Sequence, residues 1–279
     1  MPIAGIAQGL GIGGGSAATI SGSPGGNVPF LNTFSVLLDG TDDGLTMSST
    51  PVYATQSAAF SVSWWMRPVS YGSNGTYANV FALKSDFGTH ANFAVHLNNN
   101  TSGYAGISFG LTDFSTNTAY WHTTGVTGNT LLNTWSHVVI TYNGDALGTI
   151  GNWKIYINGA SKTIGVGGGW GTSGADENVI GRYRTYYYDG AIDELAVFAS
   201  ELSASNVSTF YNGGNGATDL TDFNPSAWWR MGDGTGDTDN SGGAPENGDA
   251  TGTVVDQRPL GDKNNATGTG GTLYSTSTP

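Results

Sequence analysis

Hydrophobic and polar side chains alternate in short runs between residues 30 and 214, and glycine, asparagine and aspartate separate the runs. In the run FSVSWWMRP, apolar side chains hold every second position: Phe60, Val62, Trp64 and Met66. An alternation of period two that stops at a proline predicts a half-buried strand. The run NTWSHVVITYNG (133–144) is more continuously apolar, which predicts a central strand covered on both faces.

Turn and cap signals place the neighbouring elements. The pair Asn158-Gly159 lies between two alternating runs and predicts a hairpin. A further strand is expected over DGAIDELAVF (189–198), and one short helix is expected between Ser203 as N-cap and Gly213 just past its end. About a dozen short strands with almost no helix indicate an all-β protein, an antiparallel two-sheet β-sandwich.

Composition divides the chain into three parts. Residues 1–28 are rich in glycine and serine and are expected to form an N-terminal arm, which docks on another subunit or lies along its own domain. Residues 29–215 form the predicted sandwich. Residues 216–279 are expected to add a returning strand and an extension rich in glycine and threonine, packed on the sandwich. The acidic stretch of that extension (233–253) is expected to be a solvated loop.

Charge and composition exclude several classes of protein. The chain has 9 Lys plus Arg against 21 Asp plus Glu, which gives a net charge of −12. Binding to nucleic-acid phosphates requires a basic surface, so this charge balance excludes a nucleic-acid-binding role. No apolar run approaches the roughly twenty residues of a membrane span. The chain has no cysteine, hence neither disulfides nor a thiolate metal site. The first residues of the chain are a poor secretory signal. The protein is therefore expected either to work inside a cell or to leave the cell by another route, such as the release of virus particles by lysis.

Several motifs occur in the order of a known family. LLDGTDDGLTM, FSVSWWMRP, NTWSHVVITYNG, WKIYINGASK and DGAIDELAVF, followed by the helix, resemble the laminin-G-like jelly roll of the concanavalin A-like lectin superfamily over about residues 30–215. The segments NPSAWWRMGDGTGDT and DQRPLGDKNNATGT are similar to parts of proteins encoded by marine bacteriophages. The resemblance implies a virion surface protein with other virion proteins, copies of itself and a host-surface glycan as partners.

Acidic residues in two places suggest a metal site. The alternation places either Asp193 or Glu194 among apolar neighbours, and a buried carboxylate needs a cation or several donors. That cation is either one of three arginines, Arg67, Arg182 and Arg184, or a calcium ion, which prefers clustered carboxylates. The turn with Asp39, Asp42 and Asp43 is the natural second source of ligands, since related lectin-type sandwiches often carry structural calcium. A salt bridge or backbone capping is the simpler alternative.

Glycan binding requires aromatic ring faces in loops. The candidates for this role are Trp121, Trp170 and the run Tyr186, Tyr187 and Tyr188. Glycine residues flank Trp170 and cannot bury it. For Trp170 and the tyrosine run, packing against a neighbouring subunit is an equally good interpretation.

Catalysis is not expected. A retaining glycosidase needs two carboxylates about 5 Å apart, which one strand supplies at positions two residues apart. Here Asp176-Glu177 and Asp193-Glu194 are adjacent pairs that point to opposite faces, and the chain has neither a G-x-S-x-G motif nor a cysteine nucleophile. The sequence therefore favours a phage virion surface protein that binds glycans. Its rivals are a purely structural virion subunit and a secreted bacterial carbohydrate-binding module.

Overall fold

The computed structural model describes residues 30–51, 58–72, 75, 77–83, 93–99, 106–113, 118–124, 131–166, 178–183, 185–216 and 218–279. The chain divides into two units, Met1–Phe30 and Leu31–Pro279, and the second holds the fold. The arm at residues 1–28 and Trp170 lie outside the described residues. Within the described part, no helix has the length and apolarity needed to cross a membrane.

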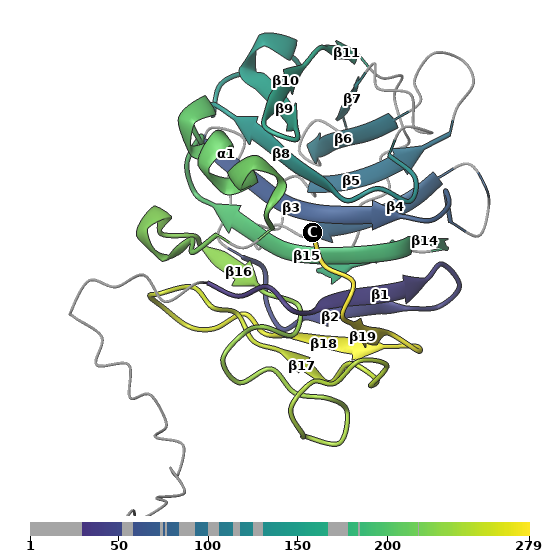
Figure 1. The fold of residues 1–279 in the computed structure, drawn as a ribbon. Coiled ribbons are helices and arrows are strands. Elements are labelled where there is room, and N and C mark those ends of the chain that lie inside the picture. The colour runs from purple at the N-terminus through teal and green to yellow at the C-terminus, as the bar shows by residue number, and fades with distance from the viewer. Residues whose placement is uncertain are drawn as a thin grey trace, which may run out of the picture. The chain divides into compact units, whose positions relative to one another are not determined.

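Two antiparallel sheets make up the fold, as the alternating runs predict (Figure 1). Sheet A has the order β10 (Ala160–Lys162), β9 (Trp153–Ile157), β8 (Ser136–Tyr142), β3 (Phe60–Pro68), β15 (Asp189–Phe198), β1 (Ser35–Asp39) and β19 (Leu273–Ser275), and β16 (Ala227–Trp229) also pairs with β15. Sheet B has the order β11 (Ile164–Val166), β7 (Thr118–Thr124), β6 (Gly106–Asp113), β5 (Phe93–Asn98), β4 (Tyr77–Leu83), β12 (Val179–Ile180), β2 (Gly44–Met47), β18 (Ala266–Thr269) and β17 (Thr253–Val254). A separate hairpin consists of β13 (Arg182–Tyr183) and β14 (Tyr186–Tyr187).

The core lies between the two sheets and is rich in aromatic rings. The predicted inward positions of β3 all belong to it: Phe60, Val62, Trp64 and Met66. The ring of Phe60 meets the ring of Phe93 from sheet B edge to face, with 5.1 Å between their centroids. Such pairs add to the free energy gained by burying the rings. The two-sheet sandwich predicted from the sequence is therefore confirmed.

The outer face of sheet A is covered by the helix α1 (Ala204–Tyr211) and the chain around it. Ser203 caps α1 at the predicted position and forms a capping box with Asn206. Tyr211 at the end of α1 stacks on Trp65 of β3, with 5.9 Å between the ring centroids. The outward side of β3 is therefore buried as well, whereas the alternation predicted a half-buried strand. The reason is that α1 supplies a third layer on this face, which a period-two pattern does not reveal.

The hairpin between β9 and β10 has the predicted turn. Asn158 and Gly159 have φ values of 52° and 74°, so both central residues adopt the left-handed conformation of a type I′ turn. The Asn158 side chain also accepts a hydrogen bond from the backbone N–H of His137 at 2.9 Å. The turn therefore fixes both the hairpin and its register against β8.

The C-terminal residues contribute strands to both sheets. Figure 1 shows the yellow strands β18 and β19 beside the purple strands β2 and β1, in agreement with the pairing of β19 with β1 and of β18 with β2. The acidic stretch is a largely exposed loop, as expected, but its aspartates also accept hydrogen bonds from the backbone. The Asp237 carboxylate, only 6% exposed, accepts three of them, from Gly232, Gly234 and Val255. Backbone–carboxylate bonds order this stretch where apolar side chains are scarce.

Candidate functional site

A bulge in β15 overturns the expectation that one of the two adjacent acids faces the core. The register against β3 shifts between Asp193 and Ala196, and Glu194 has a φ of 47°, in the left-handed region. The core residues around the bulge are Ile192, Leu195 and Val197, so neither acid points inward. Both are nevertheless buried. A bulge inserts one extra residue and redirects the side chains beside it.

The partners of the two acids come from segments far away in the sequence. Glu194 accepts a hydrogen bond from the Trp228 indole at 2.6 Å and pairs with the Arg230 guanidinium at 3.0 Å. Asp193 accepts a hydrogen bond from the Asn32 side chain at 2.8 Å. The cation that pairs with Glu194 is thus Arg230, which follows β16, and the expected pairing with Arg67 or Arg182 was wrong; Arg184 lies outside the described residues.

Burial dominates the ionisation of this pair. It raises the pKa of Glu194 to about 7, against the lowering effect of Arg230, and it raises the pKa of Asp193 as well, with Glu194 as the next cause. Each acid therefore holds its proton more tightly in the folded protein than in the unfolded chain. The pair and Arg230 form a structural cluster whose stability depends on pH.

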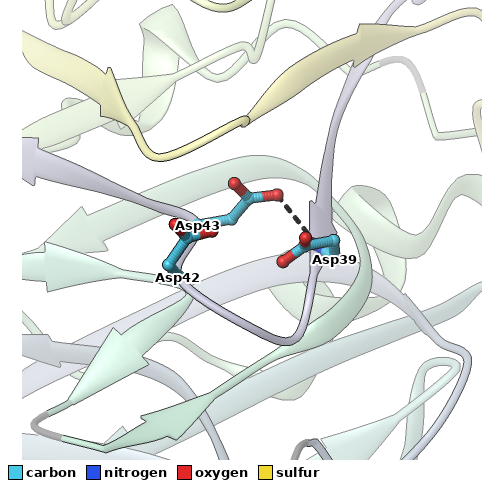
Figure 2. Close-up of side chains that lie close together, drawn as sticks. All are labelled: Asp39, Asp42 and Asp43. Carbon is cyan, nitrogen blue, oxygen red and sulfur yellow. Dashed lines mark hydrogen bonds between the residues drawn. The ribbon is translucent and has the colours of Figure 1, made fainter.

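The other three acids of the predicted metal site come together. Asp39, Asp42 and Asp43 each offer an oxygen, and these oxygens lie within 4.8 Å of one another (Figure 2). Asp39 and Asp42 are exposed and Asp43 is buried. Asp43 accepts hydrogen bonds from the backbone N–H groups of Asp39, at 2.9 Å, and of Gly271. Burial raises the pKa of Asp43.

The three clustered aspartates are separate from the acids of β15. Asp39 is opposite Asp189 in the ladder, four residues from Asp193, which corresponds to about 13 Å along a strand. Clustered carboxylates suit the chemistry of calcium. The hydrogen bonds of Asp43 show that it caps two turns, one after β1 and one before β19. Backbone capping is the role that the sequence offered as the alternative to binding calcium.

The predicted tyrosines lie in the small hairpin. Tyr186 and Tyr187 are half-buried in β14, where the Tyr186 ring meets Tyr77 of β4 at 6.3 Å. Tyr183 of β13 meets the ring of His96 at 6.2 Å. Tyr188, by contrast, is fully buried, because the chain enters β15 at this point. Its hydroxyl donates a hydrogen bond to the carbonyl of Ala191. Three tyrosines of the hairpin and Tyr77 therefore present partly exposed rings.

Polar side chains lie on the outer face of sheet B, next to this hairpin. Asn79, His96 and Ser108 follow one another across β4, β5 and β6 in the register, and each is at most 4% exposed. Asn79 Oδ1 and Ser108 Oγ have no hydrogen-bond partner among the described residues. The alternation of the sequence did not identify these three residues as candidates for a site, because a polar residue in an alternating strand is expected to face solvent. Trp121 is opposite Gly110 in the register of β7, and its side chain lies outside the described ones.

One buried pair resembles part of a catalytic triad. Ser63 Oγ lies 2.9 Å from His137 Nε2 on the outer face of sheet A. Within the described residues His137 Nδ1 has no hydrogen-bond partner, so the acid that orients a catalytic histidine is missing there. Burial lowers the pKa of His137 to about 3. The ring of Tyr211 stacks on the imidazole and the ring of Trp65 lies tilted beside it. The pair is a weak base enclosed in packing.

Comparisons with known proteins identify a family and several similar structures. The model of the family described as the concanavalin A-like lectin/glucanases superfamily matches residues 39–208. A putative carbohydrate-binding protein from Bacteroides ovatus has 16% identity and a TM-score of 0.51, with 87% of this chain and 59% of that chain covered. A pentraxin from Limulus polyphemus has 15% identity and a TM-score of 0.43, with 64% of this chain and 82% of that chain covered.

A third similar structure is domain 4 of an extracellular arabinanase from Geobacillus stearothermophilus, solved with arabinotriose. It has 20% identity and a TM-score of 0.42, with 62% of this chain and 74% of that chain covered. The comparison with curated proteins found no match. The family match covers more than half of the chain, and the antiparallel two-sheet sandwich is consistent with it: this protein belongs to the concanavalin A-like lectin/glucanases superfamily.

Proposed function

We propose that this protein is a non-enzymatic, glycan-binding protein of a virus particle, and that the tyrosine hairpin is part of its glycan-binding surface. The observation that carries the proposal is the group of partly exposed rings beside sheet B: Tyr77, Tyr186 and Tyr187. Flat aromatic faces with a polar hydroxyl suit the apolar faces and hydroxyl groups of sugars. Arg182 in the same hairpin donates a hydrogen bond to Thr46, which ties the hairpin to β2.

Binding without catalysis is supported by the state of the candidate catalytic groups. The adjacent acids of β15 are engaged by Arg230, Trp228 and Asn32, and the Ser63–His137 pair is buried. The superfamily contains both lectins and glucanases. The Bacteroides protein of similar fold is itself described as a putative carbohydrate-binding protein.

The virion role rests on sequence resemblance to marine bacteriophage proteins. In this role the partners are copies of the chain, other virion proteins and a glycan on the host surface. The purely structural subunit remains the rival, and in that case the tyrosine hairpin packs against a neighbour instead of a sugar.

A glycan array distinguishes these alternatives. The full chain, labelled and applied to the array, is expected to bind a defined set of oligosaccharides, and Tyr186→Ala is expected to reduce the signal about tenfold through loss of one stacking face. Leu260→Ala is the matched control, since Leu260 is an exposed apolar residue in the loop after β17. An array without signal for the wild-type chain would refute glycan binding and favour the structural subunit.

A further inference from the structure

We infer that the outer face of β4, β5 and β6 beside the tyrosine hairpin is a saccharide subsite, in which Asn79 and Ser108 bond sugar hydroxyls and a sugar ring replaces Tyr183. This inference rests on the proposed glycan-binding function and specifies the residues and the ligand class, a neutral saccharide. It concerns buried polar atoms that form no hydrogen bond with the described residues of the core or of the hairpin.

The unpartnered atoms are the first support. Asn79 is fully buried and Ser108 is 1% exposed, and both Asn79 Oδ1 and Ser108 Oγ lack a hydrogen-bond partner within the described part of the chain. Leaving such a group without a partner costs about 1–3 kcal/mol. Hydroxyl groups both donate and accept hydrogen bonds, so a sugar can satisfy an amide oxygen and a serine hydroxyl together.

The backbone orients one of these atoms. β4 contains a bulge between Asn79 and Phe81, and the Asn79 amide nitrogen donates to the carbonyls of Phe81 and Val95, at 3.3 Å each. The amide is therefore held at its nitrogen end while the oxygen end is left without a bond. Bulges are common beside binding sites, where they redirect a side chain.

Small side chains provide space in the neighbouring row of the same face. Ala82, Ala94 and Gly110 are paired in sequence across β4, β5 and β6, which span about 10 Å at ordinary strand spacing. Tyr183 packs against the outer-face cluster of Ala82, Ala94 and Val179. Its ring therefore occupies the position that a sugar ring needs in order to lie on the two alanines.

His96 lies between the two unpartnered residues and favours a neutral ligand. Burial lowers its pKa to about 4, so the imidazole is uncharged at neutral pH. His96 Nδ1 lies 3.4 Å from the amide nitrogen of Asn79, so the uncharged ring helps to hold that amide and places no charge beside the ligand.

The test measures affinity and stability of three variants of the full chain. The probe is the oligosaccharide with the strongest wild-type signal on the glycan array, titrated by calorimetry. We expect Ser108→Ala to weaken binding about tenfold, which is the loss of one hydrogen bond. The melting temperature should stay the same or rise, because an unpartnered buried hydroxyl is removed. Tyr183→Ala should strengthen binding, because the subsite is then open.

Ser63→Ala is the matched control, a buried serine on the outer face of the other sheet, and it should bind as the wild type does. If the wild type binds but Ser108→Ala and Tyr183→Ala both retain wild-type affinity, the subsite is overturned and the proposed function survives. If the wild type binds no oligosaccharide on the array, the proposed function fails, and the subsite with it.

Discussion

Replacing Glu194 with glutamine should remove the contribution of this acid to the pH dependence of stability. Glutamine keeps an oxygen for the Trp228 indole and cannot ionise. Burial raises the pKa of Glu194 from an ordinary 4.5 to about 7 in the folded protein. The folded state therefore binds the proton more tightly than the unfolded state does. The stabilisation from that proton is complete below pH 4.5 and is lost as the pH rises to about 7.

The size of the effect follows from the width of that interval. A difference of about 2.5 pH units corresponds to about 3 kcal/mol, since one unit is worth about 1.4 kcal/mol. Asp237 works in the same direction, because burial raises its pKa to about 6. The wild-type protein should therefore have a larger free energy of unfolding at pH 5 than at pH 8 from these groups, and Glu194→Gln should remove about 3 kcal/mol of the difference.

The assay is urea unfolding followed by tryptophan fluorescence at several pH values between 4.5 and 8. Glu201→Gln is the control, because Glu201 forms a surface pair with Lys154 at 2.6 Å, and such pairs contribute about 0–1 kcal/mol. Its pH profile should run parallel to that of the wild type. If the profile of Glu194→Gln is also parallel to the wild type, burial does not control the ionisation of this acid and the reasoning is refuted.

Two further predictions concern other carboxylates. The carboxylate of Asp256 is fully buried and accepts hydrogen bonds from the backbone N–H groups of Trp228, Arg258 and Asn264. Asp256→Ala should therefore lower the free energy of unfolding, measured by urea titration, by at least about 3 kcal/mol. A loss below about 1 kcal/mol would contradict the role of Asp256 in ordering the C-terminal segment. If the Asp39–Asp43 turn binds calcium, the melting temperature should rise on adding calcium and fall with a chelator, and Asp42→Asn should reduce the rise; an unchanged midpoint would leave backbone capping as the role of the turn.

Local patterns in the chain were sufficient for the elements and their faces. The alternation around Trp64 predicted which side of β3 faces the core, and the pair Asn158-Gly159 predicted its hairpin. The N-cap Ser203 predicted the start of α1. These features depend on neighbours a few residues away, on the two-residue period of a strand, and on backbone angles that few residue types adopt easily. They are readable from a short window of sequence.

The candidate site depended on contacts between distant segments. The bulge at Glu194 moved both acids away from the core, and their partners Arg230 and Asn32 are brought to them only when β16 and the start of the folded unit close on β15. Tyr188 is buried and Tyr186 is partly exposed, although they are two residues apart, because the hairpin ends between them. Periodicity assigns a side chain to one face of a strand, but the segment that covers that face is decided by tertiary packing. For this reason the amino-acid sequence determined a lectin-like sandwich and its inward residues, while the tertiary structure alone decided which polar groups are paired, which are buried, and which meet beside the tyrosine hairpin.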